Sequence, residues 1–98
     1  MRIIAKSTLR SFWEAGHGDA REPLMTWHAV VSHANWRVPA DVKRRYPSVS
    51  FLNNNRLVFN IKGNKYRLIA GMDYAGQRLF IHFVGTHSEY DQIDAAVI

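Results

Sequence analysis

With 98 residues, the sequence is long enough for one hydrophobic core but not for two, so we expect a single domain over residues 1–98. Because cysteine is absent and no apolar run approaches the roughly 20 residues of a membrane span, we expect no disulfide, no thiol chemistry and no membrane partner, in a cytoplasmic protein. The formal net charge of +5 favours a polyanionic partner such as RNA, DNA or an acidic protein.

The first half of the chain predicts one short strand followed by helices. Arg2–Lys6 is apolar at its centre and predicts the strand, and a helix is expected from Ser7 to the glycines at 16 and 18. Pro23 fits the first turn of a second helix, and Pro39–Pro47 predicts a short third one. The first two helices carry apolar side chains at helical spacing, which we expect in the core: Leu9, Phe12, Trp13, Leu24, Trp27, Val30 and Val31.

The second half predicts three strands joined by tight turns. They are Arg56–Lys62, Lys65–Tyr74 and Arg78–Gly85, and the short turns between them favour an antiparallel meander. We therefore predict an α+β fold in which an N-terminal strand and two to three helices pack on one face of a small antiparallel sheet.

Strand alternation sorts the side chains of these strands into two faces. The face expected beneath the helices holds Leu57, Phe59, Ile61, Tyr66, Leu68, Ala70, Met72, Leu79, Ile81 and Phe83. The other face holds Arg56, Val58, Asn60, Lys62, Lys65, Arg67, Ile69, Arg78, Phe80, His82 and Val84. Every strand places basic groups on this second face, which therefore predicts a groove for a polyanion, although a shift at either turn would change the register.

The basic residues also cluster along the sequence. No acidic residue lies between Asp41 and Asp73, and this interval adds Lys43, Arg44 and Arg45 to the predicted RNA-binding residues Arg56 and Lys62. On the same predicted face, Phe80 beside His82 could stack a base.

Arg67 lies in mid-strand, where an unpaired charge is costly if apolar groups cover it. One reading is a salt bridge to Asp73 or Asp91; the other is binding of phosphate oxygens by the planar guanidinium, which we favour.

The stretch from Val84 to Asp91 closes the last strand with several reactive side chains. Thr86 and Glu89 have the spacing of a capping box, which predicts the start of a helix. That helix would place His87, Tyr90 and Asp91 on one side, where a His oriented by Asp91 could transfer protons. The alternative is that Tyr90 packs inward and His87 is merely solvated. No compact metal-ligand spacing is present, so we predict no metal.

The blocks "FNIKGNKYRLIAGMDY" and "FIHFVGTHSEYDQIDA" closely resemble the HigB-type toxins of type II toxin-antitoxin modules, which belong to the RelE-like mRNA interferases. The resemblance implies a small ribonuclease that cuts mRNA, typically on translating ribosomes, with no metal or cofactor. It also implies an antitoxin with a helix-turn-helix domain that covers the toxin and binds the operator DNA, so that the toxin meets DNA only through the antitoxin.

Carried over residue by residue, the family's site residues match Asn60, Lys62, Lys65, Arg67, His87, Tyr90 and Asp91. Arg67 and Lys65 are then assigned to the scissile phosphate, His87 to proton transfer, and Tyr90 with Asp91 to positioning; Asn60 and Lys62 are assigned to RNA binding. Relatives commonly hold Arg at the positions of Gly71 and His82, so two permanent charges are missing here. The alternative is therefore a catalytically weak homologue that binds RNA or the antitoxin.

Overall fold

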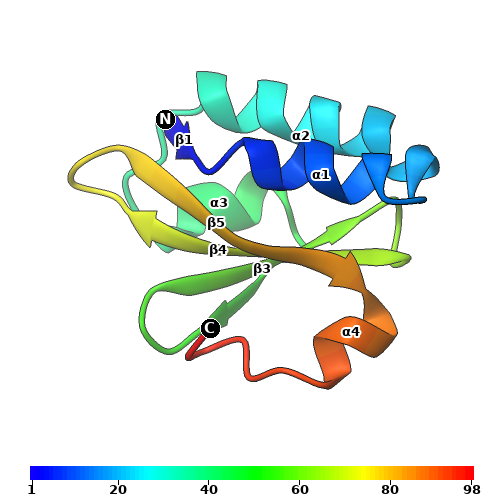
Figure 1. Ribbon diagram of the computed structural model, residues 1–98. Helices are drawn as coiled ribbons and strands as arrows, with labels where there is room; N and C mark the ends of the chain where they lie inside the picture. The colour runs from blue at the N-terminus through cyan, green and yellow to red at the C-terminus, as the bar shows by residue number, and fades with distance from the viewer.

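The computed structural model describes residues 1–98 as one sheet with helices on both faces. Figure 1 shows helices α1 and α2 side by side over one face, and α4 with the chain end on the other. No helix is both long and apolar enough to cross a membrane. In chain order the elements are β1 (Arg2–Ile4), α1 (Ser7–Glu14), the 3₁₀ turn η1 (Gly18–Ala20), α2 (Arg21–His33), α3 (Pro39–Arg45), β2 (Ser50–Leu52), β3 (Arg56–Ile61), β4 (Tyr66–Asp73), β5 (Arg78–Thr86) and α4 (His87–Asp91).

The sheet has the strand order β1-β5-β4-β3-β2. The predicted antiparallel meander of β3, β4 and β5 is confirmed, and so is the α+β class. The sheet is nevertheless mixed, because β1 pairs in parallel with β5. The short strand β2, which the sequence analysis missed, pairs with β3 across the asparagine turn. The expected antiparallel sheet is therefore extended by one strand at each edge.

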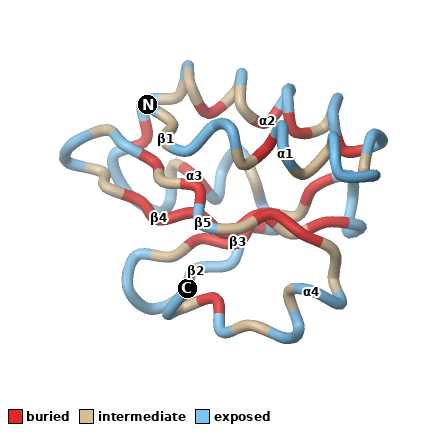
Figure 2. Tube along the Cα trace, viewed as in Figure 1, coloured by how far each residue is buried: buried red, intermediate tan, exposed pale blue.

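The main core lies between the sheet and the helices α1, α2 and α3. Leu24, Trp27 and Val31 of α2 are buried, as their spacing on one helical face predicts, and Trp27 meets Phe59 of β3 edge to face with 5.4 Å between the ring centroids. Figure 2 shows the buried strand segments at the centre of the molecule. Each large side chain removed from water here contributes about 1.5–3 kcal/mol to folding. This core holds the strands that carry the candidate site.

A β-bulge in β5 changes the face of the sheet on which Phe83 and Val84 lie. Ile81 pairs with Ala70, but Phe83 pairs with Ile69, so His82 is the extra residue. As a result Phe83 packs against Ile69 on the second face, and Val84 is buried in the main core. The predicted faces of Phe83 and Val84 were therefore both wrong, because strict alternation does not hold across a bulge.

The second face of the sheet is partly covered by the end of the chain. Val58 and Ile69 are only 1% and 0% exposed because Ala95 packs on them. Half-buried Tyr90 and Ile93 extend this small cluster. The predicted groove is thus not an open basic face, and its polar part lies at the margins of a second apolar cluster.

Gly85 leaves room for the Phe83 ring on this second face. A Cβ at residue 85 would overlap Cζ of Phe83 and lie 3.1 Å from Oε1 of Glu89. We expect Gly85→Ala to lower the free energy of unfolding by about 1–3 kcal/mol, because overpacking displaces a half-buried ring. Urea unfolding measures this change. Gly18→Ala is the control, since a Cβ there meets no heavy atom within 4 Å; equal losses for both variants would contradict the expectation.

Candidate active site

Arg67 lies at the centre of the candidate site. It pairs across the sheet with Asn60 of β3 and with Gly85 of β5. The side chain of Arg67 reaches α4, where Nε donates a hydrogen bond to Nε2 of His87 at 3.3 Å. Its guanidinium also lies over the ring of Tyr90, 5.1 Å from the centroid. Three residues assigned together from the sequence are thus in direct contact.

Helix α4 is fixed by the capping box that the sequence predicts. The Thr86 amide donates to Oε1 of Glu89 at 2.9 Å, and the Glu89 amide donates to Oγ1 of Thr86 at 3.2 Å. His87 is the first residue of this helix, and Tyr90 follows at i+3 on the same side. The capping box therefore sets the position from which His87 meets Arg67.

Asp91 does not orient His87, contrary to the expectation from their i, i+4 spacing. The partners of the His87 ring are Arg67 and Asn64, whose Oδ1 lies 3.2 Å from the same Nε2 atom. Asp91 is exposed and makes no side-chain hydrogen bond in the structure. Asn64 was missed because the sequence marks it only as a turn residue beside Gly63.

The two contacts of His87 Nε2 require opposite protonation states. An unprotonated Nε2 accepts the hydrogen bond from Arg67, whereas a protonated Nε2 donates to the oxygen of Asn64. One nitrogen cannot do both in the same state. Each state of the ring therefore has a partner, which suits a group that takes up or gives a proton.

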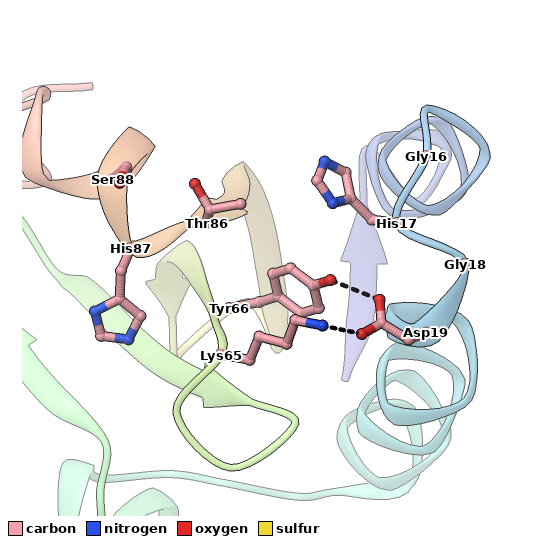
Figure 3. Close-up of a pocket in the computed structure, with 9 residues that line it drawn as sticks. All are labelled: Gly16, His17, Gly18, Asp19, Lys65, Tyr66, Thr86, His87 and Ser88. Carbon is pink, nitrogen blue, oxygen red and sulfur yellow. Dashed lines mark hydrogen bonds and ion pairs between the residues drawn. The ribbon is translucent and has the colours of Figure 1, made fainter.

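Lys65 lies elsewhere, and its predicted place beside Arg67 was wrong. Its ammonium pairs with Asp19 of η1, and the Tyr66 hydroxyl donates to Oδ1 of Asp19 at 2.6 Å. In Figure 3 the Lys65 side chain points toward Asp19. Strand β4 begins only at Tyr66, so Lys65 belongs to the turn and does not follow strand alternation.

The chain matches one known protein family over most of its length. Residues 20–93 match the family described as the RelE-like toxic component of a toxin-antitoxin system, HigB toxin. The chain belongs to the HigB toxin family. The matched segment contains Arg67, His87 and Tyr90. Because the members of this family are toxins of toxin-antitoxin systems, an antitoxin is a partner of this HigB-family chain.

Individual HigB proteins are similar over most of their length. The mRNA interferase HigB of Escherichia coli O6:H1 (strain CFT073) is 25% identical over 95 residues, which cover 95% of this chain and 91% of the relative. The mRNA interferase toxin HigB of Escherichia coli K12 is 26% identical over 93 residues, which cover 93% and 88%. The mRNA interferase HigB of Shigella flexneri has the same identity and coverage.

Around Gly71 this HigB-family chain departs from the expected pattern of arginines. The His82 ring lies over Gly71, and a Cβ added there would be 2.6 Å from His82 Nε2. Partial desolvation of the ring, and to a lesser extent the charge of Arg56, lower the pKa of His82, which favours the neutral form. His82 therefore does not replace a permanent positive charge.

Arg56 is occupied by two main-chain oxygens, one at Ile98 and one in the turn before β3. Its guanidinium donates to the oxygen of Ile98 at 2.9 Å and to that of Asn54 at 3.3 Å. Lys62 is exposed in the turn after β3, and Phe80 is half-buried beside the bulge. Lys62 is thus more accessible to RNA than Arg56.

The basic residues of α3 lie in the helix layer, on the opposite side of the sheet from α4. Val42 of this helix is buried in the main core. The cations have local partners: Lys43 donates to the oxygen of Val49, Arg44 pairs with Asp41, and Arg45 lies over the ring of Tyr46. The structure therefore does not bring Lys43, Arg44 and Arg45 together with Arg67.

The pairing of Asp19 makes stability depend on acidity. Hydrogen bonds from Lys65 and Tyr66 lower the pKa of Asp19 from 3.8 to about 2. The folded-state pKa is below the unfolded one, so the pair stabilises the protein above pH 3.8 and this contribution is lost as the pH falls toward 2. We expect Asp19→Asn to make unfolding less dependent on pH between pH 5 and 2, measured by urea titration at each pH. An unchanged pH dependence would contradict this.

Proposed function

We propose that this chain is an endoribonuclease that cleaves mRNA as the toxin of its module. The observation that carries the proposal is the contact of Arg67 with Nε2 of His87 beside Tyr90, because it joins a permanent cation to a group that can transfer a proton. The names of the similar proteins, mRNA interferases, support the choice of substrate.

In the proposed reaction the 2′-hydroxyl attacks the adjacent phosphate. A bond from the 2′-oxygen to phosphorus forms, the bond from phosphorus to the 5′-oxygen breaks, and a 2′,3′-cyclic phosphate remains. One proton leaves the 2′-oxygen and one reaches the 5′-oxygen. His87 makes one of these transfers through Nε2, and the Arg67 guanidinium donates to the phosphate oxygens as their charge grows. Tyr90 holds the guanidinium from its ring face.

The proposed setting is the translating ribosome, with cleavage of the mRNA that it holds. The proposed antitoxin carries a helix-turn-helix domain, so operator DNA is reached through the antitoxin. Incubating purified mRNA with the chain, with and without ribosomes, tests the first point: cleavage of equal rate in both would overturn it.

A catalytically weak homologue that binds RNA or the antitoxin is the second candidate. It is favoured by His82, which lies over Gly71 with a lowered pKa, and by the engagement of Arg56 with main-chain oxygens. Both leave fewer free positive charges on the strands beside Arg67. Such a protein would bind mRNA fragments without producing new ends.

Induction of the chain in a bacterial host, alone and with its antitoxin, separates the two candidates. We expect growth arrest and new mRNA 5′ ends with the chain alone, and neither when the antitoxin is present. Absence of both effects with the chain alone would overturn the enzyme proposal. Binding of RNA without new ends would favour the weak homologue.

A further inference from the structure

A pocket of about 710 Å³ lies beside His87 and is not lined by Arg67. This volume is in the range of about 300–1,000 Å³ that is typical of small-molecule sites. One wall comes from η1 and the turn before it, the other from the start of α4, and β4 forms the floor (Figure 3). The pocket is lined by Gly16, His17, Gly18, Asp19, Lys65, Tyr66, Thr86, His87 and Ser88.

The carboxylate of Asp19 is a fixed hydrogen-bond acceptor in this pocket. Tyr66 donates to Oδ1 at 2.6 Å and the Lys65 ammonium donates to the other oxygen, so both oxygens are held in place. A carboxylate has about four acceptor positions, and these two bonds leave the others free. The side chain is 35% exposed, so these positions are open to a ligand. A donor group entering the pocket therefore finds a partner without rearrangement.

The pocket suits a base better than a phosphate. Lys65 is neutralised by Asp19, and a second anion beside that carboxylate would be repelled. A planar ring, in contrast, finds the His17 ring at the wall. Phe12 stacks on one face of this ring, with 4.2 Å between centroids and 7° between planes, and Tyr66 meets it at 77° with 5.6 Å between centroids. Stacking on rings of this kind is a common way in which proteins hold unpaired RNA bases.

We propose that this pocket receives the base of the nucleotide next to the scissile phosphate, and that Asp19 selects a base with an exocyclic amino group. The inference rests on the proposed function, because His87 links the phosphate at Arg67 to the pocket. The carboxylate accepts a hydrogen bond from the amino group, while Lys65 has further N–H groups for a ring nitrogen or carbonyl oxygen of the base.

The order of preference follows from the edges of the bases. Guanine offers a carbonyl oxygen, which suits the Lys65 ammonium, beside two N–H donors, which suit the Asp19 carboxylate. It therefore matches this pair more fully than the other bases do. Adenine and cytosine each offer one amino group beside an acceptor. Uracil offers only a ring N–H between two carbonyl oxygens, which would face the carboxylate. We therefore expect guanine to bind best and uracil worst.

The test is a titration of the purified chain with trinucleotides that differ in one base and carry a 2′-deoxy sugar at the cleavage position. Guanine at the tested position is expected to give about tenfold tighter binding than uracil. Amide NMR signals of residues 16–19 and 86–88 should shift, and Asp19→Asn should remove the difference between bases. Equal affinity for all bases, or shifts confined to other residues, would overturn the inference.

Two further variants separate recognition from folding. Gly18→Leu places a side chain in open space and leaves the bonds of Asp19 intact, so it should fill the pocket and weaken binding of every trinucleotide without lowering Tm. Glu14→Gln removes a negative charge from α1, where the side chain pairs with Arg10, and should change nothing. Unaltered binding by Gly18→Leu would also overturn the inference.

The proposed function and this inference can fail separately. If the chain produces no new mRNA 5′ ends but distinguishes the trinucleotides, the enzyme proposal falls and the base pocket stands. If it cleaves mRNA and Asp19→Asn leaves the bases flanking the cut unchanged, the base pocket falls and the enzyme proposal stands.

Discussion

Replacing Arg67 with alanine is expected to slow mRNA cleavage by about a hundredfold to a thousandfold and to abolish growth arrest. The guanidinium is the one permanent charge in direct contact with His87, so its loss leaves the developing phosphate charge without a preorganised donor at this place. Arg67→Lys keeps the charge but not the planar fork, and should restore only part of the rate. Single-turnover cleavage of an mRNA fragment measures both variants.

The matched control for Arg67 is Arg10→Ala. Arg10 lies on α1 and pairs with Glu14 at 3.1 Å, in the helix layer on the opposite side of the sheet from α4. The Arg10→Ala variant should cleave at the unmutated rate. Thermal unfolding of each variant shows whether a loss of activity is due to a folding defect. Full growth arrest by Arg67→Ala would remove this residue from the mechanism.

Replacing His87 with alanine is expected to reduce the cleavage rate by about a hundredfold to ten-thousandfold, the usual contribution of a positioned acid or base. His87→Gln places an amide within reach of Arg67 and Asn64 but cannot carry a proton, so it should be nearly as slow. A pH–rate profile that loses one limb in both variants would identify the missing proton transfer.

Coupling between the two residues gives a second measurement. Because they act on one phosphate and touch each other, the double variant should be little slower than the slower single variant. His33→Ala is the matched control for His87→Ala, since the exposed His33 ring bonds only to the main chain of its own helix. If the fall in cleavage rate of the double variant equals the product of the two single falls, the two residues act independently.

Sequence pattern predicted the core and the meander because both follow local periodicity. The stripe of Leu24, Trp27 and Val31 and the alternation along β3 place side chains correctly. Alternation failed at His82, since a bulge adds a residue without a marker in the sequence. The parallel pairing of β1 with β5 depends on chain topology rather than on either strand alone.

The candidate site was predictable where neighbours in sequence are neighbours in space. His87 and Tyr90 belong to one helical turn, and Thr86 marks where that turn begins. Lys65 was misplaced because its partner Asp19 is 46 residues away and no local pattern joins them. Likewise, nothing in the sequence around Ala95 indicates that it covers Val58. Long-range contacts of single residues are therefore what the sequence alone left open.

The parallel pairing of Arg2–Ile4 with Arg78–Phe80 has a consequence for synthesis of the protein. Arg2 in the first strand leaves the ribosome 76 residues ahead of Arg78, with which it pairs. Pairings of such large sequence separation form late and slowly. His87 emerges later still, so an incomplete chain has neither the finished sheet nor the proposed proton-transfer group. Cleavage of mRNA would thus begin only after both Arg78–Phe80 and His87 have left the ribosome.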